Sequence, residues 1–181
     1  SKVILRSISC DFTGKAYDGE QIRNARAYLT NVNATCPIWG ECLYAERYVN
    51  RGMLSEADIS RFKDESLIIN DLGTIGKDII HCDVNMICYP NLPDSEGPGT
   101  SFTRLVIEGE IAGQIWYWPI DINRGDDIAQ EGVGRNMEYI YDIRITRKGS
   151  ADPDTAIETG CVEFIMEVRE WKEKDEYKEV F

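Results

Sequence analysis

Two stretches near the end of the chain decide its fold: NMEYIYDIRIT at residues 136–146 and CVEFIMEVREW at residues 161–171. Apolar side chains take the odd positions of the first stretch and the even positions of the second, with mostly polar residues between them. A period of two is typical of a strand with one dry face and one wet face. The polar loop over residues 147–160 joins the two, which predicts an antiparallel pair of strands lying on a core.

The rest of the chain repeats this pattern. Further strands are predicted by apolar or alternating segments at residues 3–12, 22–32, 81–89, 103–108 and 110–120. The last two are expected to turn near Gly109. About seven or eight strands with no helix between successive strands indicate an antiparallel β-sandwich rather than a parallel α/β sheet. No repeat or linker divides the chain, so a single domain over residues 1–181 is expected.

One short helix is predicted inside this β pattern. Ser55 is suited to cap the N-terminus of a helix, and acidic residues follow it in the first turn, near the positive end of the helix dipole. The helix is expected over residues 56–63, with Ile59 and Phe62 facing inward. A second short helix over residues 65–71 is a weaker alternative.

The charge of the chain excludes several partners. With 32 acidic and 20 basic residues, the formal net charge is −12. Such a surface repels phosphate backbones and anionic membranes, so nucleic-acid binding is not expected. No apolar run reaches the roughly 18 residues of a membrane span. Residues 1–6 do not form a signal peptide, because their apolar part is only three residues long.

Six cysteines allow two interpretations: Cys10, Cys36, Cys42, Cys82, Cys88 and Cys161. An even count is typical of disulfides in an exported protein. The shared parity of Cys82 and Cys88 with apolar neighbours instead favours buried thiols. If a bridge forms, Cys36–Cys42 is the expected pair. The spacings do not suit zinc, and no metal or other cofactor is expected.

No catalytic motif is present. His81, the single histidine, is expected among apolar side chains of a strand, where a structural role is favoured. The sequence has no G-x-S-x-G elbow and no phosphate-binding glycine loop, and the glycines at 132 and 134 precede no helix. Residues 121–127 resemble a calcium loop only weakly, because the required glycine and bidentate glutamate are missing. The chain is therefore expected not to be an enzyme, although a hydrolase with paired carboxylates remains a third alternative.

The order of several segments in the C-terminal half resembles a known family, the Bacteroidales fimbrillins, which are subunits of type V pili. The resemblance is carried by WYWPI at 116–120, NRGD at 123–126, GVGRNMEY at 132–139, YDIRITRKG at 141–149, SADPD at 150–154, GCVEF at 160–164 and VREW at 168–171. It is strongest over about the last 80 residues. The first half, including YLTNV at 28–32, is compatible with it.

The resemblance implies a transthyretin-like β-sandwich that is exported to the outer membrane and assembled into fimbriae on the cell surface. It also implies that subunits join when a strand of one fills a groove in the next, so other fimbrial subunits are the expected partners. Members of the family carry two such domains, whereas 181 residues suit one. The chain is then a C-terminal domain, a trimmed form, or an anchor or tip variant.

Two sites follow from this interpretation. Trp171, Tyr177 and Phe181 share odd parity in the tail, as in a strand that presents aromatic anchors to a neighbouring subunit. The alternative is a terminal edge strand folded on its own domain, with charges that discourage pairing. Thr155, in Asp154-Thr155-Ala156, resembles the acceptor of O-glycosylation in these bacteria and lies in a predicted loop.

The leading hypothesis is a non-enzymatic structural or adhesive subunit of fimbriae. The rival is a sandwich module at a pilus tip that binds carbohydrates or a host surface. This rival requires Trp39, Trp116 or Trp118 to be exposed for stacking on a ligand.

Overall fold

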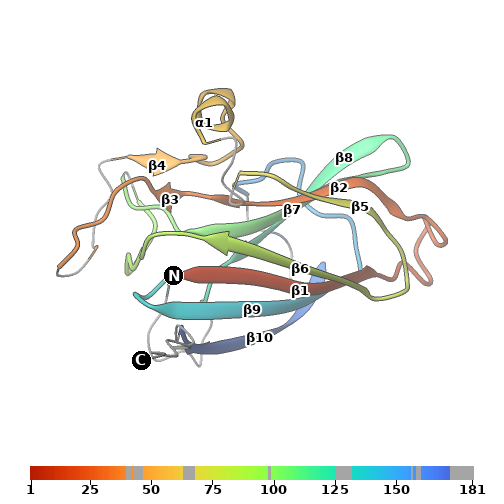
Figure 1. Ribbon diagram of the computed structural model, residues 1–181. Helices are drawn as coiled ribbons and strands as arrows, with labels where there is room; N and C mark the ends of the chain where they lie inside the picture. The colour runs from red at the N-terminus through yellow and green to blue at the C-terminus, as the bar shows by residue number, and fades with distance from the viewer. Residues whose placement is uncertain are drawn as a thin grey trace, which may run out of the picture.

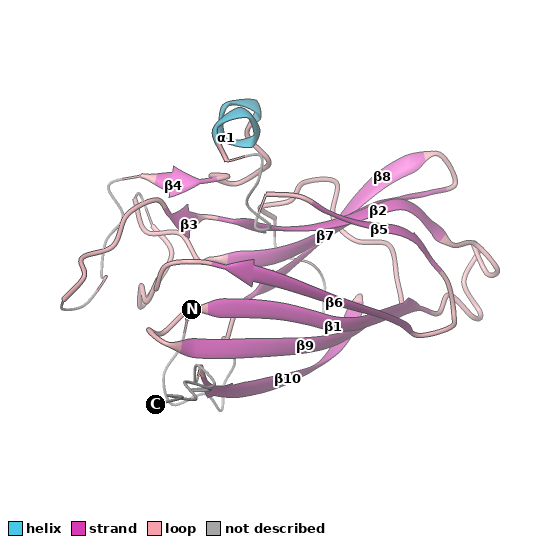
Figure 2. Ribbon diagram, in the orientation of Figure 1, coloured by secondary structure: helices cyan, strands magenta, loops and turns pink. Residues whose placement is uncertain are grey.

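The computed structural model describes residues 1–39, 42, 47–62, 68–97, 99–124, 132–155, 157 and 160–171 (Figures 1 and 2). Within these residues the chain forms ten strands and one short helix. In chain order they are β1 (Lys2–Cys10), β2 (Ile22–Thr30), β3 (Val32–Asn33), β4 (Tyr48–Val49), α1 (Glu56–Arg61), β5 (Asn70–Ile75), β6 (Ile80–Ile87), β7 (Arg104–Ile111), β8 (Gln114–Asp121), β9 (Met137–Ile145) and β10 (Val162–Glu170).

Eight of the strands form two four-stranded sheets that lie one above the other in Figure 1. The strand order is β10-β9-β1-β6 in one sheet and β5-β2-β7-β8 in the other. All pairings are antiparallel except that between β1 and β9, which run parallel. The short β3–β4 ribbon and α1 lie beyond the second sheet (Figure 2).

The core lies between the two sheets because each strand turns alternate side chains inward. β1 and β9 contribute Leu5, Ile8, Tyr139, Tyr141 and Ile143, all of them buried. The other sheet contributes Ala25, Ala27 and Leu29 from β2, Leu105 and Ile107 from β7, and Trp118 from β8. The small alanines of β2 therefore share one layer with the large Trp118, which fills the space between the sheets.

The expected β-sandwich with one short inserted helix is confirmed. The strand count is higher than expected because the segment over residues 22–32 divides at Asn31, which has a positive φ of 54°, and because β3–β4 and β5 were not predicted. The parallel pairing of β1 with β9 also departs from a purely antiparallel arrangement. The weaker alternative of a second helix over residues 65–71 is wrong at its end, because β5 begins at Asn70; residues 63–67 lie outside the described part.

The turn expected near Gly109 is wrong. β7 continues through Gly109, which pairs with Trp116, and the turn lies at Ala112-Gly113, where both residues have positive φ. Gly109 is required for close packing instead: a Cβ at this position would lie 2.3 Å from Cγ2 of Ile22. In the sequence alone, this glycine indicates a turn. In the structure it lies inside β7, where the missing side chain lets β2 pack close to the strand.

The helix begins as predicted. The Ser55 side chain accepts a hydrogen bond from the Asp58 backbone N–H (3.3 Å), and Ile59 and Phe62 pack against the core. The buried Asp58 carboxylate pairs with Arg47 and accepts a hydrogen bond from the Asn50 N–H (3.0 Å). These contacts attach α1 to the chain beside β4. Among the described residues no helix is long and apolar enough to cross a membrane.

Candidate functional site

The two sheets have four edge strands, and two of them, β6 and β5, are irregular. β6 contains Asp83 with a positive φ of 44°, and its register with β1 shifts between Leu5 and Ser7. The register of β5 with β2 shifts twice, around Ala25. Irregular edges of this kind discourage pairing with another strand.

The edge strand β8 is covered. The Tyr117 backbone N–H donates to the Ser150 carbonyl (2.9 Å) and the Ser150 N–H donates back (2.8 Å), so the segment after β9 lies along this edge. Pro119, two residues further along β8, faces the same side as Tyr117. Because proline has no backbone N–H, it offers no donor to an added strand on that side. Gly149 permits the close approach, because a Cβ there would lie 2.0 Å from the Tyr117 carbonyl oxygen.

β10 differs from the other three. All nine of its residues pair with β9 in one unbroken register, and among the described strands nothing pairs with its other side. Hydrogen bonds at both ends of this pair fix its pattern: Trp171 N–H donates to the Asn136 carbonyl (2.8 Å) and Thr146 N–H donates to the Cys161 carbonyl (3.0 Å). Directions alternate along an antiparallel ladder, so the even-numbered residues 162–170 point their N–H and C=O groups away from β9.

The side chains of β10 are also less covered than the alternation predicted. Phe164 and Val168, expected on the dry face, are 45% and 39% exposed, and Ile165 on the opposite face is 71% exposed. Phe164 still contacts Tyr141, with ring centroids 5.6 Å apart. Arg169, on the outer face of the sheet, donates to Glu138, its directly opposite partner on β9 (2.7 Å). β10 therefore combines a regular row of backbone groups with exposed apolar side chains, which is the chemistry that an added strand uses.

The predicted tail site is only partly described. Trp171 is half-buried, and its N–H bonds to Asn136 of its own domain, which continues the β9–β10 ladder. This contact favours a strand folded on its own domain at this residue. Tyr177 and Phe181 lie outside the described residues.

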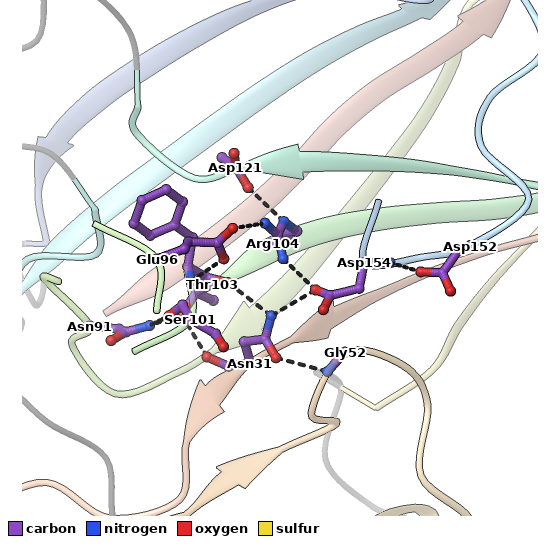
Figure 3. Close-up of polar contacts among 11 residues, drawn as sticks. Asn31, Gly52, Asn91, Glu96, Ser101, Thr103, Arg104, Asp121, Asp152 and Asp154 are labelled. Carbon is purple, nitrogen blue, oxygen red and sulfur yellow. Dashed lines mark hydrogen bonds and ion pairs between the residues drawn. The ribbon is translucent and has the colours of Figure 1, made fainter. Parts of the chain in front are cut away.

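A polar cluster around Arg104 lies at the ends of β7 and β8 (Figure 3). Arg104 is 4% exposed, and its guanidinium meets three carboxylates. It donates to Asp121 (2.7 Å), directly opposite on β8, to Glu96 (2.7 Å) and to Asp154. Burial works to lower the pKa of Arg104, but the three carboxylates raise it overall. Burial raises the pKa of Asp121, although Arg104 opposes this rise. One buried cation thus joins the end of β8 to two loops, those that carry Glu96 and Asp154.

Buried amides and a hydroxyl extend this cluster. Asn31 donates to Asp154 (3.2 Å) and accepts from the Gly52 N–H (2.8 Å). Thr103 donates to the Asn31 carbonyl (2.9 Å), and Asn91 donates to the Thr103 hydroxyl (2.9 Å). Figure 3 shows these bonds linking β2, the loop before α1 and the loop before β7. No motif in the sequence indicated this cluster, because its members are distant in the chain.

The cluster anchors the loop that carries the predicted modification site. The Asp154 carboxylate is held by Arg104 and Asn31, and the Asp154 N–H donates to the Asp152 carboxylate (2.7 Å). The next residue, Thr155, is exposed. The backbone before Thr155 is therefore fixed while the residue itself faces solvent.

The three tryptophans of the rival interpretation differ in exposure. Trp118 is fully buried and donates to the Arg147 carbonyl (2.9 Å), and Trp116 is half-buried beneath Lys148. Trp39 is 88% exposed, and its neighbour Ile38 is 82% exposed. Among these three residues, Trp39 alone is available for stacking on a ligand.

In the described part of the chain, the remaining candidate residues do not form a catalytic or metal-binding site. His81 is exposed on β6, so the expectation that apolar side chains surround it is wrong: it has the parity opposite to Cys82. Residues 125–127 of the calcium-like loop lie outside the described part of the chain, which breaks off after Arg124 and resumes at Gly132. Among the described residues, no three His, Cys, Asp or Glu side chains are grouped as a metal would require.

Comparison with known proteins finds solved structures with a similar fold. Neither a family model nor a curated protein sequence matches the chain. Among solved structures, a fimbrilin from Porphyromonas gingivalis W83 is similar, with a TM-score of 0.61 and 12% identity. Two candidate cell adhesion proteins from Parabacteroides distasonis ATCC 8503 are similar with TM-scores of 0.59 and 0.53, at 17% and 14% identity.

Each likeness covers 94% of this chain but only 51%, 57% or 58% of the solved one. The chain therefore spans little more than half the length of these structures. At this level of identity the comparison establishes a shared fold. The resemblance to fimbrillins that the sequence indicated is present in three dimensions.

Proposed function

We propose that the chain is a non-enzymatic subunit, or one domain of a subunit, of fimbriae on the bacterial surface. The fold shared with a fimbrilin and with candidate cell adhesion proteins supports this proposal. Coverage of little more than half of those structures suits one domain of a longer subunit, such as the C-terminal domain. In this proposal the protein is exported, and its partners are other fimbrial subunits.

Subunits join by strand addition along the free side of β10. The observation that carries this step is the nine-residue strand with an unbroken register and no partner on its outer side among the described strands. An added strand satisfies the outward backbone groups, and the half-exposed Phe164 and Val168 give it apolar contacts. The other three edges are irregular or covered, so β10 is the best acceptor.

Electron microscopy of surface fibres, with and without the gene, tests the role in fimbriae. Cells that carry Val168→Lys test the β10 edge, because a charge on an edge strand opposes pairing. We expect no fibres without the gene and few with Val168→Lys. Normal fibres with Val168→Lys would contradict joining at β10 while leaving the fimbrial role intact.

The tail is the proposed donor of the added strand, with Tyr177 and Phe181 as its aromatic anchors. Deletion of residues 172–181 should then prevent assembly without altering the fold of the remaining domain. Unchanged fibre assembly after this deletion would rule out the tail as donor. Because the Trp171 backbone bonds to its own sheet, the donor segment is expected to begin after this residue.

A second role as an adhesive module at the tip is supported by the exposure of Trp39 and Ile38. An exposed indole stacks on the apolar faces of sugars or inserts into an apolar pocket of a partner. Trp39→Ala should reduce adhesion to host or bacterial glycans without affecting fibre assembly. Equal adhesion by the variant would remove this role.

Thr155 is the proposed acceptor of an O-linked glycan, since it is exposed next to an anchored aspartate. An intact mass measured on protein from its native host should exceed the sum of its residues. Thr155→Ala should abolish the excess, and an unmodified mass of the unaltered protein would dismiss the site.

A further inference from the structure

The exposed Trp39 lies in the segment between two neighbouring cysteines, Cys36 and Cys42. Cys36 is half-exposed and Cys42 is buried. Burial, followed by a hydrogen bond with the Cys36 thiol, raises the pKa of the Cys42 thiol to about 11. The Cys42 sulfur also lies 3.8 Å from the carbonyl oxygen of Thr35, the residue directly before Cys36, so the two cysteines are neighbours in space.

Side chains from other segments hold each sulfur in place. Asn33, which is buried, donates from Nδ2 to the Cys42 sulfur (3.4 Å) and to the Pro90 carbonyl (2.6 Å). Arg135 donates from one guanidinium nitrogen to the Cys36 sulfur (3.5 Å) and to the Pro37 carbonyl (2.9 Å). The two thiols are therefore oriented by residues outside the segment that joins them.

The other cysteines are arranged differently. The thiols of Cys10 and Cys82 contact the backbone carbonyls of Ile75 (3.3 Å) and Leu5 (3.4 Å). Burial raises the pKa of the Cys88 thiol to about 11, and Cys161 is also buried. Buried thiols of this kind are inert. Cys36 is the cysteine that combines partial exposure with a neighbouring guanidinium.

We propose that Cys36 and Cys42 form a disulfide, while the other four cysteines remain thiols. The bond closes a covalent ring of chain that includes Ile38 and Trp39. The inference is independent of strand addition at β10, because it concerns a covalent bond within one chain. The ring restricts the backbone that carries the two exposed apolar side chains. It therefore fixes how Trp39 is presented to solvent or to a partner.

The oxidant is a disulfide of a small thiol or of a thiol oxidoreductase. The Cys36 thiolate attacks one sulfur of this disulfide, and one thiolate leaves as a mixed disulfide forms at Cys36. The Cys42 thiolate then attacks the Cys36 sulfur, and the second thiolate leaves. The protons lost by the two cysteines end on the two released thiols, so the protein loses two hydrogens and the oxidant is reduced. The Arg135 guanidinium, 3.5 Å from the Cys36 sulfur, orients this sulfur for the first step.

Thiol counting in the unfolded protein tests the pairing. After incubation with oxidised glutathione, the chain should take up four alkyl groups without reductant and six with it, since two of its six cysteines are bonded. Cys36→Ser should take up five in both conditions. The control Cys82→Ser should take up three and then five, which preserves the difference of two. Six alkyl groups without reductant would overturn the proposal.

Cleavage of the oxidised protein after Trp39 tests directly which cysteines are bonded. Chymotrypsin cuts beside exposed aromatic residues, and this cut lies between the two cysteines. The two fragments of the oxidised protein should stay together on a denaturing gel until a reductant is added, whereas those of Cys36→Ser should separate at once. Cys36 linked to Cys88 would also hold the fragments, so peptide mapping must show Cys36 joined to Cys42. Arg135→Gln should slow oxidation several-fold, and an unchanged rate would remove Arg135 from the step.

Discussion

At the scale of single residues, Arg104 has the largest predicted effect on stability. Its guanidinium is buried, while its three carboxylate partners are each more than a third exposed. Arg104→Met removes the cation and leaves Asp121 at a partly buried position without its partner. Removal of one member of a buried ion pair costs about 3–5 kcal/mol. Because the partners reach solvent, we expect a loss of about 2–3 kcal/mol in the free energy of unfolding, measured by urea denaturation.

Arg6→Met is the matched control for this change. Arg6 also pairs with two carboxylates, Asp142 and Glu167, but on the surface of the other sheet. Exposed ion pairs contribute little, so the loss should be much smaller than for Arg104→Met. Equal losses for the two variants would show that burial does not determine the contribution of the Arg104 cluster.

Asp142 should contribute a pH dependence to stability. Hydrogen bonds from Arg6 lower the pKa of its carboxyl; burial opposes this, and a hydrogen bond from Ser7 adds to it. The folded-state pKa lies below the unfolded value of about 3.9, so the stabilisation is complete above that value and is lost as pH falls through the folded pKa. The difference in unfolding free energy between the unaltered protein and Asp142→Asn should therefore shrink from pH 6 to pH 2.

A comparison of the two proteins at each pH is necessary because Asp11 changes in the same range. Hydrogen bonds from Thr13 and Arg144 lower the pKa of Asp11 as well. Asp11 titrates equally in both proteins, so its effect cancels in the difference. A difference that does not vary with pH would contradict the role of Asp142.

At the scale of elements, the direction of the backbone groups along β10 gives a paired prediction. The Val168 N–H points outward, whereas the Arg169 N–H points toward β9. Val168→Pro should remove a donor for the added strand and prevent assembly at little cost to the fold. Arg169→Pro should break a bond of the β9–β10 ladder and lower the unfolding free energy by about 1–3 kcal/mol, the cost of leaving its acceptor on β9 unsatisfied. Fibre assembly is measured by electron microscopy, and stability by thermal unfolding.

The reverse outcome would contradict the assignment of the free edge. If Val168→Pro destabilises the domain as much as Arg169→Pro, its N–H serves the fold and not a partner. If Val168→Pro folds and still forms fibres, subunits join elsewhere.

The edge of β8 depends on Gly149. Gly149→Ala places a Cβ about 2 Å from the Tyr117 carbonyl, which must displace either the 149–150 segment or β8. We expect a loss of about 1–3 kcal/mol in unfolding free energy. The control Gly134→Ala meets side chains only at ordinary contact distance, 3.4 Å from Met137 and 3.5 Å from the Tyr139 hydroxyl, and should change stability by less than about 0.5 kcal/mol. Similar values for both would mean that Gly149 does not hold this segment against β8.

The same elements show how far the sequence predicts this structure. Alternation correctly assigns the inward side chains of β9, and Val162 and Met166 of β10, since that depends only on the local backbone period. It does not predict that Phe164 stays half-exposed, because coverage depends on how far the opposite sheet extends. β5 was missed because Asn70, Asp71 and Gly73 are unfavourable in strands, and tertiary pairing with β2 overrides this preference.

The candidate site was predicted less well for the same reason. Arg104 meets Asp154 across a separation of 50 residues, and nothing local in either segment indicates the contact. The parallel pairing of β1 with β9 also depends on contacts between distant segments. The exposure of Trp39, by contrast, agrees with its place outside every strand and helix that the sequence predicts. Sequence patterns determine local elements, and distant contacts determine the edges and clusters that function uses.

At the scale of the whole molecule, the net charge of −12 opposes self-association, because every copy carries it. β10 itself carries Glu163, Glu167 and Glu170 beside the edge where we propose that another copy binds. The Debye length falls from about 30 Å at 0.01 M salt to about 10 Å at 0.1 M. Repulsion between approaching copies is then largely screened, whereas backbone hydrogen bonds and apolar contacts along the strand are not.

The rate of assembly, followed by light scattering, should therefore rise several-fold between 10 and 150 mM sodium chloride. Val168→Pro should show no assembly at either salt concentration, which separates specific strand addition from salt-induced aggregation. Faster assembly at low salt would mean that oppositely charged surfaces, and not the edge of β10, bring the subunits together.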